Sequence, residues 1–216
     1  MRVIVHEFMS LDGVVQGPGA PDEDTDDGFA QGGWILPFVQ HSGWGDVIDR
    51  WFERADRILL GRRTHDIMRP FWTDRDQGSN VAAAALRAAP KYVISTTTSS
   101  STWENTRVIA EKPCEVVSQL RDMPGGELQV HGSWQVVSAL QRADLVDEYR
   151  LIVFPIVLGN GKRVFPQGCP PIRFGEATSE WLGHGITYRR LAVAGRGPVL
   201  PRRGNTGGSA VLRAIG

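Results

Sequence analysis

The sequence predicts an α/β fold, in which a mainly parallel sheet is flanked by helices and ends in an antiparallel hairpin at its C-terminal edge. Two observations predict it. Across the first two thirds of the 216 residues, apolar runs of strand length alternate with amphipathic stretches of helical period. In the last third, strand-like runs follow one another with a turn between each pair. Helices join parallel strands and short turns join antiparallel ones, so the arrangement changes along the chain.

The individual elements follow from these periods. Residues 3–8 form the first apolar run and residues 44–54 the first amphipathic stretch, and strands and helices then alternate as far as residue 142. From residue 149 onward the pattern favours strands. Strands are expected at residues 3–8, 57–60, 92–94, 108–109, 128–130, 149–158, 172–174 and 186–193. Helices are expected at residues 44–54, 64–68, 81–88, 115–121 and 134–142.

Three segments differ from this pattern. Residues 17–33 are rich in Gly and Pro and carry five acids between residues 22 and 27, which indicates a long loop. Gly159-Asn160-Gly161 is a turn signal between two apolar runs. Residues 197–216 are rich in chain breakers, poor in apolar residues and basic, so we expect a disordered tail after one domain over residues 1–196.

Composition excludes several classes of protein. The 24 Lys and Arg balance the 24 Asp and Glu, which argues against a broad nucleic-acid surface and favours small molecules or proteins as partners. Cys114 and Cys169 fit neither a disulfide scaffold nor a zinc site. No run approaches the roughly 18 apolar residues that span a bilayer, and charges come too early for a signal peptide. We therefore expect a cytoplasmic protein without a membrane segment.

Polar turns follow three of the expected parallel strands. Carboxyl ends of parallel strands share one edge of a sheet, where such sheets bind ligands. Glycines permit close turns, arginines and helix N-termini bind anions, and hydroxyls donate to phosphate or ribose oxygens, so the three turns together predict a dinucleotide site. In one turn we expect Thr64 to cap the following helix. The turns are Gly61-Arg62-Arg63-Thr64, Ser95-Thr96-Thr97-Thr98-Ser99 and His131-Gly132-Ser133.

Simpler explanations exist for each turn. A glycine after a strand is commonly turn chemistry alone, and Arg62 and Arg63 could pair with the acids of residues 22–27. The sequence contains neither GxGxxG after the first strand nor GxxxxGK[ST], which excludes the usual Rossmann fingerprint and the P-loop. A serine hydrolase elbow around Ser133 lacks its closing glycine. His6, His41, His65 and His184 show no metal-ligand spacing, so no metal is expected.

A set of motifs between residues 2 and 193 resembles dihydrofolate reductase family proteins built on the C-terminal reductase domain of the riboflavin-biosynthesis deaminase/reductase. The motifs occur in the family's order. They are Ser10-Leu11-Asp12-Gly13-Val14-Val15, Pro21-Asp22-Glu23-Asp24, Gly32-Gly33-Trp34, Leu60-Gly61-Arg62-Arg63-Thr64, Lys91-Tyr92-Val93-Ile94-Ser95, Val130-His131-Gly132-Ser133 and residues 153–165.

The resemblance implies a dihydrofolate-reductase-like sheet, NADPH as hydride donor and a homodimer. It assigns the phosphate turn to Gly61, Arg62, Arg63 and Thr64, the adenosine side to Ser95 and Thr96, and the pyrophosphate turn to Gly132 and Ser133. It places Asp12 beside the nicotinamide, where the carboxylate could orient substrate or deliver a proton through water. Bracing of an Asp-Gly turn is the alternative role of Asp12. The expected substrate contacts are Ser10, Trp34, Leu158 and Gly159.

These features predict an NADPH-dependent reductase of a small pteridine- or pyrimidine-like substrate, with 5-amino-6-(5-phosphoribosylamino)uracil of riboflavin biosynthesis as one candidate. A non-catalytic nucleotide- or small-ligand-binding protein on the same fold is the alternative. Reduction of folate itself is disfavoured, because only Asp46 and Asp49 in the first helix could match the acid that binds the pterin.

Overall fold

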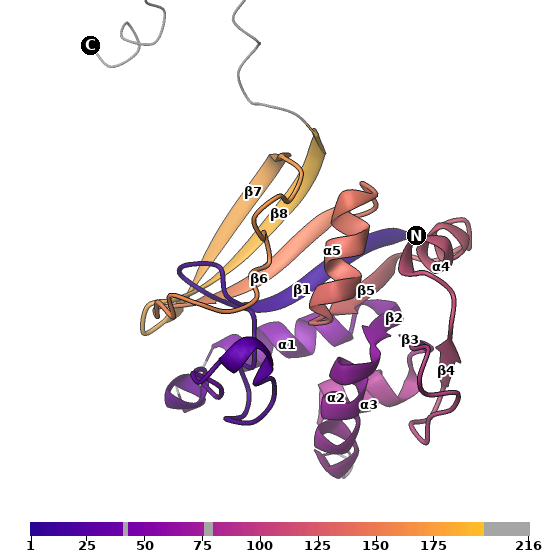
Figure 1. Ribbon diagram of the computed structural model, residues 1–216, viewed down its shortest axis with the longest axis horizontal. Coiled ribbons are helices and arrows are strands. Elements are labelled where there is room, and N and C mark those ends of the chain that lie inside the picture. The colour runs from indigo at the N-terminus through magenta and orange to yellow at the C-terminus, as the bar shows by residue number, and fades with distance from the viewer. Residues whose placement is uncertain (41–42, 76–79, 197–216) are drawn as a thin grey trace, which may run out of the picture.

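One sheet organises the molecule. The computed structural model describes residues 1–40, 43–75 and 80–196. In this part, eight strands lie in the order β4-β3-β2-β5-β1-β6-β8-β7 (Figure 1). The six from β4 to β6 are parallel, and β8 and β7 complete the sheet in antiparallel pairing. The predicted fold class is confirmed.

The elements have the following bounds. The strands are β1 (Arg2–Ser10), β2 (Ala55–Gly61), β3 (Lys91–Ile94), β4 (Thr106–Ile109), β5 (Glu127–His131), β6 (Glu148–Phe154), β7 (Ile172–Gly183) and β8 (Ile186–Arg196). The helices are α1 (Trp44–Phe52), α2 (Arg62–Arg75), α3 (Val81–Ala88), α4 (Pro113–Arg121) and α5 (Trp134–Arg142). Short 3-10 helices occupy Asp26–Gly28 and Leu36–Phe38. The expected tail, residues 197–216, lies outside the described residues.

Two expected strands differ most from the structure in where they end. The strand expected at 149–158 stops at Phe154, because Pro155 has no N–H for the sheet, and the chain then turns toward the loop after β1, where Leu11 donates to the carbonyl of Ile156 at 2.8 Å. The strand expected at 172–174 continues to Gly183 as β7. Its later residues are mostly polar and exposed, as suits an edge strand, and their apolar pattern is correspondingly weak.

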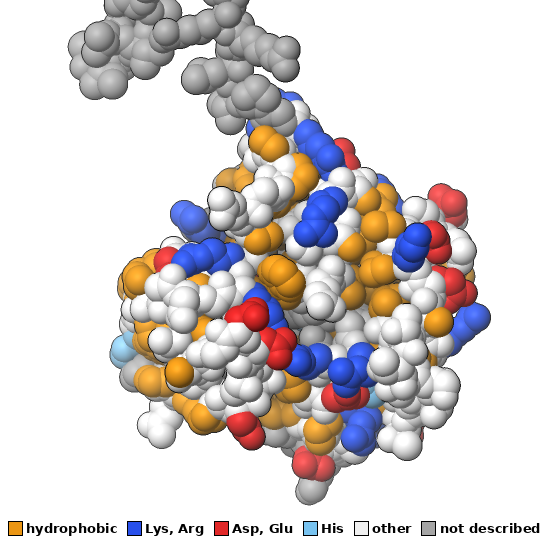
Figure 2. Space-filling view, in the orientation of Figure 1, with side chains coloured by type: hydrophobic (Ala, Val, Ile, Leu, Met, Phe, Trp, Pro, Cys, Tyr) orange, Lys and Arg blue, Asp and Glu red, His pale blue; other side chains and the backbone are white. Residues whose placement is uncertain are grey.

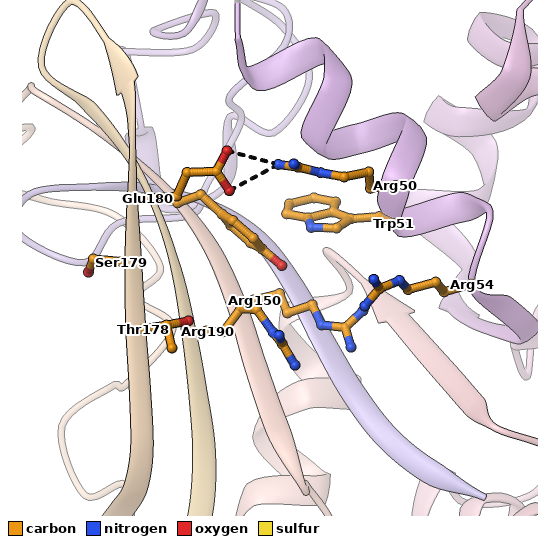
Figure 3. A pocket seen from close by; sticks show the side chains of 9 residues that line it. Arg50, Trp51, Arg54, Arg150, Thr178, Ser179, Glu180 and Arg190 are labelled. Atoms are coloured by element: carbon orange, nitrogen blue, oxygen red, sulfur yellow. Dashed lines mark hydrogen bonds and ion pairs between the residues drawn. The ribbon is translucent and has the colours of Figure 1, made fainter.

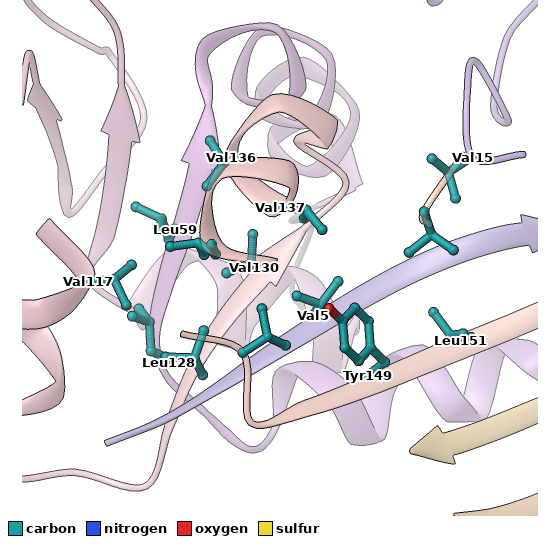
Figure 4. Close-up of a cluster of buried hydrophobic side chains, with 14 of the residues drawn as sticks. Val5, Val15, Leu59, Val117, Leu128, Val130, Val136, Val137, Tyr149 and Leu151 are labelled. Atoms are coloured by element: carbon teal, nitrogen blue, oxygen red, sulfur yellow. The ribbon is translucent and has the colours of Figure 1, made fainter. Parts of the chain in front are cut away.

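Helices cover both faces of the sheet. On one face, α4 and α5 pack over β5, β1 and β2, and Figure 4 shows the buried cluster beneath them, which includes Leu59, Leu128, Val130 and Val137. On the other face, α1 packs over a cluster that contains Phe154 and Tyr188, and α3 over one that contains Ile58. None of the described helices combines the length and apolar character needed to cross a bilayer.

The side chain of Leu59 is fully buried in the cluster under α5. Leu59→Ala should lower the free energy of unfolding by about 2–5 kcal/mol, because it removes buried methyl groups and leaves a cavity. Leu11→Ala is the matched control, since Leu11 is 62% exposed and its loss should change stability by no more than about 0.5 kcal/mol. Urea unfolding followed by circular dichroism measures both, and equal losses would contradict this assignment of the core.

Candidate active site at the carboxyl edge of the sheet

The residues predicted to bind ligand follow strands that end at one edge of the sheet. Gly61 of β2 pairs with Ile94 of β3, His6 of β1 with His131 of β5, and Ser10 of β1 with Phe154 of β6. Since all five strands are parallel, the turns after them project from the same edge. The register thus brings segments that are far apart in the sequence to one side of the molecule.

Ser133 joins two of the three predicted turns. Its hydroxyl accepts a hydrogen bond from the Gly61 N–H at 2.8 Å and donates to the His131 carbonyl at 2.9 Å. Its own N–H donates to Thr64 Oγ1 at 3.0 Å. Gly132 has a φ of 50°, and a Cβ there would lie 3.3 Å from the Thr64 side chain, so a glycine suits this close turn.

Thr64 does not cap its helix as expected. α2 begins at Arg62, directly after the last residue of β2, and this places Thr64 inside the first turn. Its hydroxyl is used by Ser133 instead. The expected cap assumed a linker between strand and helix, whereas strand pairing extends to Gly61 and leaves no linker.

Two helix N-termini therefore lie beside each other at this edge. Ser133 precedes α5 with a left-handed φ of 60°, and within the described chain no side chain caps this helix. The first N–H groups of a helix have no partner inside it and, with the helix dipole, favour anions. The contact between Ser133 and Thr64 sets the start of α5 against the start of α2.

The acidic loop of residues 17–33 covers the start of α2. Nη1 of Arg63 lies 2.7 Å from Oδ1 of Asp24 and 2.6 Å from Oδ2 of Asp26. Arg62 pairs with Asp66 at 2.8 Å, one helical turn along α2. The pairing of the arginines with acids of residues 22–27, raised above as an alternative, thus occurs for Arg63 and not for Arg62.

Lys162 is a second cation in this cluster, which sequence reasoning missed. Its Nζ lies 2.7 Å from Asp24 Oδ2 and 2.8 Å from Asp26 Oδ2. Hydrogen bonds from Arg63, and then from Lys162, hold the pKa of Asp26 well below its usual value. Figure 2 shows acidic and basic side chains side by side across the middle of this face. The position of Lys162 just after the Gly159-Asn160-Gly161 turn was the signal available in the sequence.

The third predicted turn follows β3, which neighbours β2, and its buried serine hydroxyl is hydrogen-bonded within the turn itself. Ser95 is buried, and its hydroxyl accepts from the N–H groups of Thr97 at 3.2 Å and Thr98 at 3.0 Å. Thr96 is exposed beside it. Thr96 is therefore the more accessible hydroxyl of the pair.

The carboxylate of Asp12 is held by its surroundings. It accepts hydrogen bonds from Ser10 Oγ at 2.7 Å, from the Leu158 N–H at 3.1 Å and from the Gly159 N–H at 2.9 Å. Arg163 lies 3.3 Å away and also donates to the Asp12 carbonyl. Although burial acts to raise the pKa of Asp12, these hydrogen bonds lower it to about 2. The loop after β1 is thereby tied to the segment after β6.

Three of the four residues expected at the substrate contact Asp12, and the fourth, Trp34, lies in the acidic loop. Ser10 is fully buried, and Leu158 and Gly159 meet Asp12 through their main chain. Trp34 is 4% exposed, donates from Nε1 to the Gln16 carbonyl at 2.8 Å and packs edge-on against Phe154. Trp34 therefore anchors the acidic loop to the core.

Two histidines meet in the sheet. His6 and His131 stack with ring centroids 4.6 Å apart, because β1 and β5 are neighbours. Burial lowers the pKa of both, that of His131 to about 3, so both imidazoles are neutral at pH 7. Among the described residues, no three His, Cys, Asp or Glu side chains form a group suited to a metal ion.

Comparison with known proteins decides the family. The family model of the RibD C-terminal domain matches residues 1–188. The chain belongs to the RibD C-terminal domain family. The resemblance inferred from the motifs is confirmed.

Solved structures share the fold of this RibD C-terminal domain protein. A Shewanella sp. PV-4 protein named for riboflavin biosynthesis aligns over 89% of this chain and 99% of its own, with 23% identity and a TM-score of 0.65. Enterococcus faecalis dihydrofolate reductase complexed with NADP(H) aligns over 90% and 97%, with 12% identity and a TM-score of 0.54. The Thermotoga maritima diaminohydroxyphosphoribosylaminopyrimidine deaminase/5-amino-6-(5-phosphoribosylamino)uracil reductase aligns over 89% and 56%, with 15% identity and a TM-score of 0.56.

The hydrogen bonds to Asp12 predict a specific effect of pH on stability. Its folded pKa of about 2 is below the usual 3.8, so its contribution is present above pH 4 and is lost as pH falls toward 2. At pH 7, Asp12→Asn should lower the free energy of unfolding by about 1.5–3 kcal/mol, the range for hydrogen bonds to a charged group. Urea unfolding at several pH values measures the difference between the two proteins, which should shrink below pH 4. A difference that is the same at pH 7 and pH 2.5 would contradict this assignment.

Proposed function

We propose that this protein is an NADPH-dependent reductase of a small pteridine- or pyrimidine-like substrate. The observation that carries the proposal is the pair of helix N-termini, α2 and α5, joined through Ser133 at the carboxyl edge of the sheet. Membership of the RibD C-terminal domain family supports it, as do the fold neighbours named as reductases. The first substrate to test is 5-amino-6-(5-phosphoribosylamino)uracil, which the name of the Thermotoga maritima neighbour contains.

The residues at the edge fit a dinucleotide phosphate. The uncapped start of α5 offers main-chain N–H groups, and Gly132 keeps the turn before it free of a side chain. Arg62 and Arg63 offer guanidinium groups that match the oxygens of an additional phosphate. NADPH would supply a hydride to the substrate when bound. The protein would hold its phosphates at Gly61, Arg62, Arg63, Thr64, Gly132 and Ser133, and its adenosine at Ser95 and Thr96.

The ion pairs of the two arginines differ in what a phosphate must displace. Arg62 and Asp66 are both about half exposed, and such a surface pair is worth about 0–1 kcal/mol. Arg62 can therefore turn toward a phosphate at little cost. Arg63 would have to exchange Asp24 and Asp26 for the phosphate, so the acidic loop competes with the cofactor.

On the substrate side, the contacts favour a positioning role for Asp12. Its low pKa keeps the carboxylate ionised at neutral pH, so it holds no proton to donate. It fixes the main chain of Leu158 and Gly159 opposite Ser10. We place the substrate beside these residues, beneath the loop that Trp34 anchors. The homodimer and cytoplasmic location expected from the sequence complete the proposal, and light scattering of the purified protein tests the dimer.

The phosphate turn predicts that the protein prefers NADPH to NADH. One charge-assisted contact contributes about 1.5–3 kcal/mol, so Kd should differ by about 10- to 100-fold. Isothermal titration should show that Arg62→Gln with Arg63→Gln weakens NADPH binding by a similar factor and leaves NADH nearly unchanged. Arg107→Gln, at an exposed arginine on β4, is the matched control. Equal Kd values for the two cofactors in the intact protein would refute the assignment of the turn.

Turnover tests the reductase directly. Loss of NADPH absorbance should accompany reduction of one member of a panel of pterins, flavin precursors and 5-amino-6-(5-phosphoribosylamino)uracil. With that substrate, Asp12→Asn should lower kcat/KM while the shape of its pH profile and the Kd for NADPH stay the same, because a positioning residue does not exchange the proton. A loss of about 100-fold together with a missing ionisation in the profile would instead assign proton transfer to Asp12.

A nucleotide-binding protein without catalysis is the second candidate. The observation that favours it is the engagement of the Asp12 carboxylate with Ser10 and two main-chain N–H groups, which leaves it poorly placed to act on a substrate proton. This candidate shares the prediction for cofactor binding. It is distinguished by saturable NADPH binding without oxidation of NADPH by any member of the panel.

A further inference from the structure

A ligand-sized cavity lies away from the carboxyl edge. It has a volume of about 330 Å³ and opens between α1 and the strands β6, β8 and β7. Figure 3 shows that side chains from the helix and from the strands face one another across it, with Arg50 of α1 reaching Glu180 of β7. Its lining residues are Arg50, Trp51, Arg54, Arg150, Thr178, Ser179, Glu180, Tyr188 and Arg190.

Ion pairs with glutamates hold two of the four lining arginines in place, the buried Arg150 and the partly exposed Arg190. Arg150 has a side chain that is 2% exposed, and it lies 2.7 Å from Glu148 through Nε and 2.9 Å from Glu127 through Nη1. Arg190 shares the same glutamate, with its Nε 3.1 Å from Glu148 Oε1. The cross-strand register sets Arg150 of β6 directly against Arg190 of β8. Strand pairing and the shared Glu148 therefore fix the positions of the Arg150 and Arg190 guanidinium groups.

Positive charge exceeds negative charge in this region. Arg50 pairs with Glu180, so the four lining arginines stand against Glu127, Glu148 and Glu180. Within the described chain, the guanidinium of Arg54 has no acidic partner and is exposed. The remaining positive charge, on Arg54, faces a concave surface, where an anion is bound more strongly than on a flat one.

Two aromatic side chains also line the cavity. Trp51 is 4% exposed, and its ring packs against that of Tyr188 with centroids 6.1 Å apart. Burial raises the pKa of Tyr188, although a side-chain hydrogen bond with Trp51 acts to lower it, so the hydroxyl stays protonated as a donor at neutral pH. The cavity therefore combines guanidinium groups with a phenol donor and two aromatic rings.

Aromatic side chains separate this cavity from the carboxyl edge. Trp51 packs against Phe8 at 6.2 Å, and Phe8 packs against Trp44 at 5.7 Å and Phe154 at 5.9 Å between ring centroids. None of the residues assigned to cofactor or substrate in the proposed function lines the cavity. A ligand here would leave the dinucleotide edge accessible.

We propose that this arginine-lined cavity binds a small organic phosphate, of the size of a sugar phosphate, at a site distinct from the cofactor edge. Converging guanidinium forks suit the oxygens of a phosphoryl dianion. Arg54 and Arg190 hold the phosphoryl group, and Trp51 and Tyr188 contact the organic part. The volume exceeds what an inorganic ion would fill and lies in the range of small-molecule sites.

Isothermal titration with glucose 6-phosphate, glucose and inorganic phosphate tests this proposal. Glucose 6-phosphate should bind in a saturable manner and more tightly than inorganic phosphate, and glucose should not bind. Arg54→Gln should weaken binding by about 10- to 100-fold, because it removes a charge-assisted contact from a residue with no partner in the fold. Tyr188→Phe, which retains the ring and removes the hydroxyl, should weaken binding by a smaller factor.

Two control variants separate the sites. Arg62→Gln alters the cofactor edge and Arg107→Gln alters an exposed arginine on β4, so neither should change the affinity for glucose 6-phosphate. Absence of saturable binding at millimolar concentrations would overturn the proposal. So would equal affinity for inorganic phosphate, which indicates an adventitious ion only, or an equal loss in Arg62→Gln, which places the anion at the cofactor edge. These results do not depend on NADPH binding or turnover, so they stand apart from the proposed function.

Discussion

Four charges hold the acidic loop against the carboxyl edge of the sheet, and the accessibility of the candidate site depends on them. The inner pair, Asp24 and Lys162, is shielded, with side chains 14% and 16% exposed. The outer pair, Arg63 and Asp26, is nearly half exposed and more strongly solvated. Because solvation weakens an ion pair, a phosphate can compete with Asp26 for Arg63 while Lys162 still retains the loop through Asp24. A phosphate bound as we propose would therefore not require the loop to detach.

The two candidate sites use different physical devices on one sheet. At the carboxyl edge, parallel strands align their turns, and the contact between Ser133 and Thr64 sets the starts of α2 and α5 together. On the α1 face, the antiparallel hairpin sets Arg150 against Arg190, and glutamates fix both guanidinium groups. The first site depends on backbone direction and the second on cross-strand register. The aromatic cluster around Phe8 and Phe154 fills the space between them.

Features formed by residues close together in the sequence can be predicted from it, whereas contacts between distant residues cannot. Hydrophobic periodicity is a local pattern, so it predicts where the helices and strands lie. It places the end of β6 too late because Pro155 lies within an apolar run. The common edge of the turns followed from parallel topology. Contacts that depend on strand order, such as Ser133 with Gly61 or His6 with His131, require neighbours that periodicity does not specify. The arginine-lined cavity likewise brings α1 together with strands β6, β7 and β8, which lie far later in the sequence, and the pattern of the sequence does not specify this contact.

We propose that a dinucleotide lies across the starts of α2 and α5, and a crystal structure of the protein with NADPH tests this placement. We expect phosphate oxygens within hydrogen-bond distance of the first N–H groups of α5, the additional phosphate on Arg62 or Arg63, and Asp26 released from Arg63. A dinucleotide bound at the arginine-lined cavity, or density absent from the edge at a saturating concentration of NADPH, would contradict it.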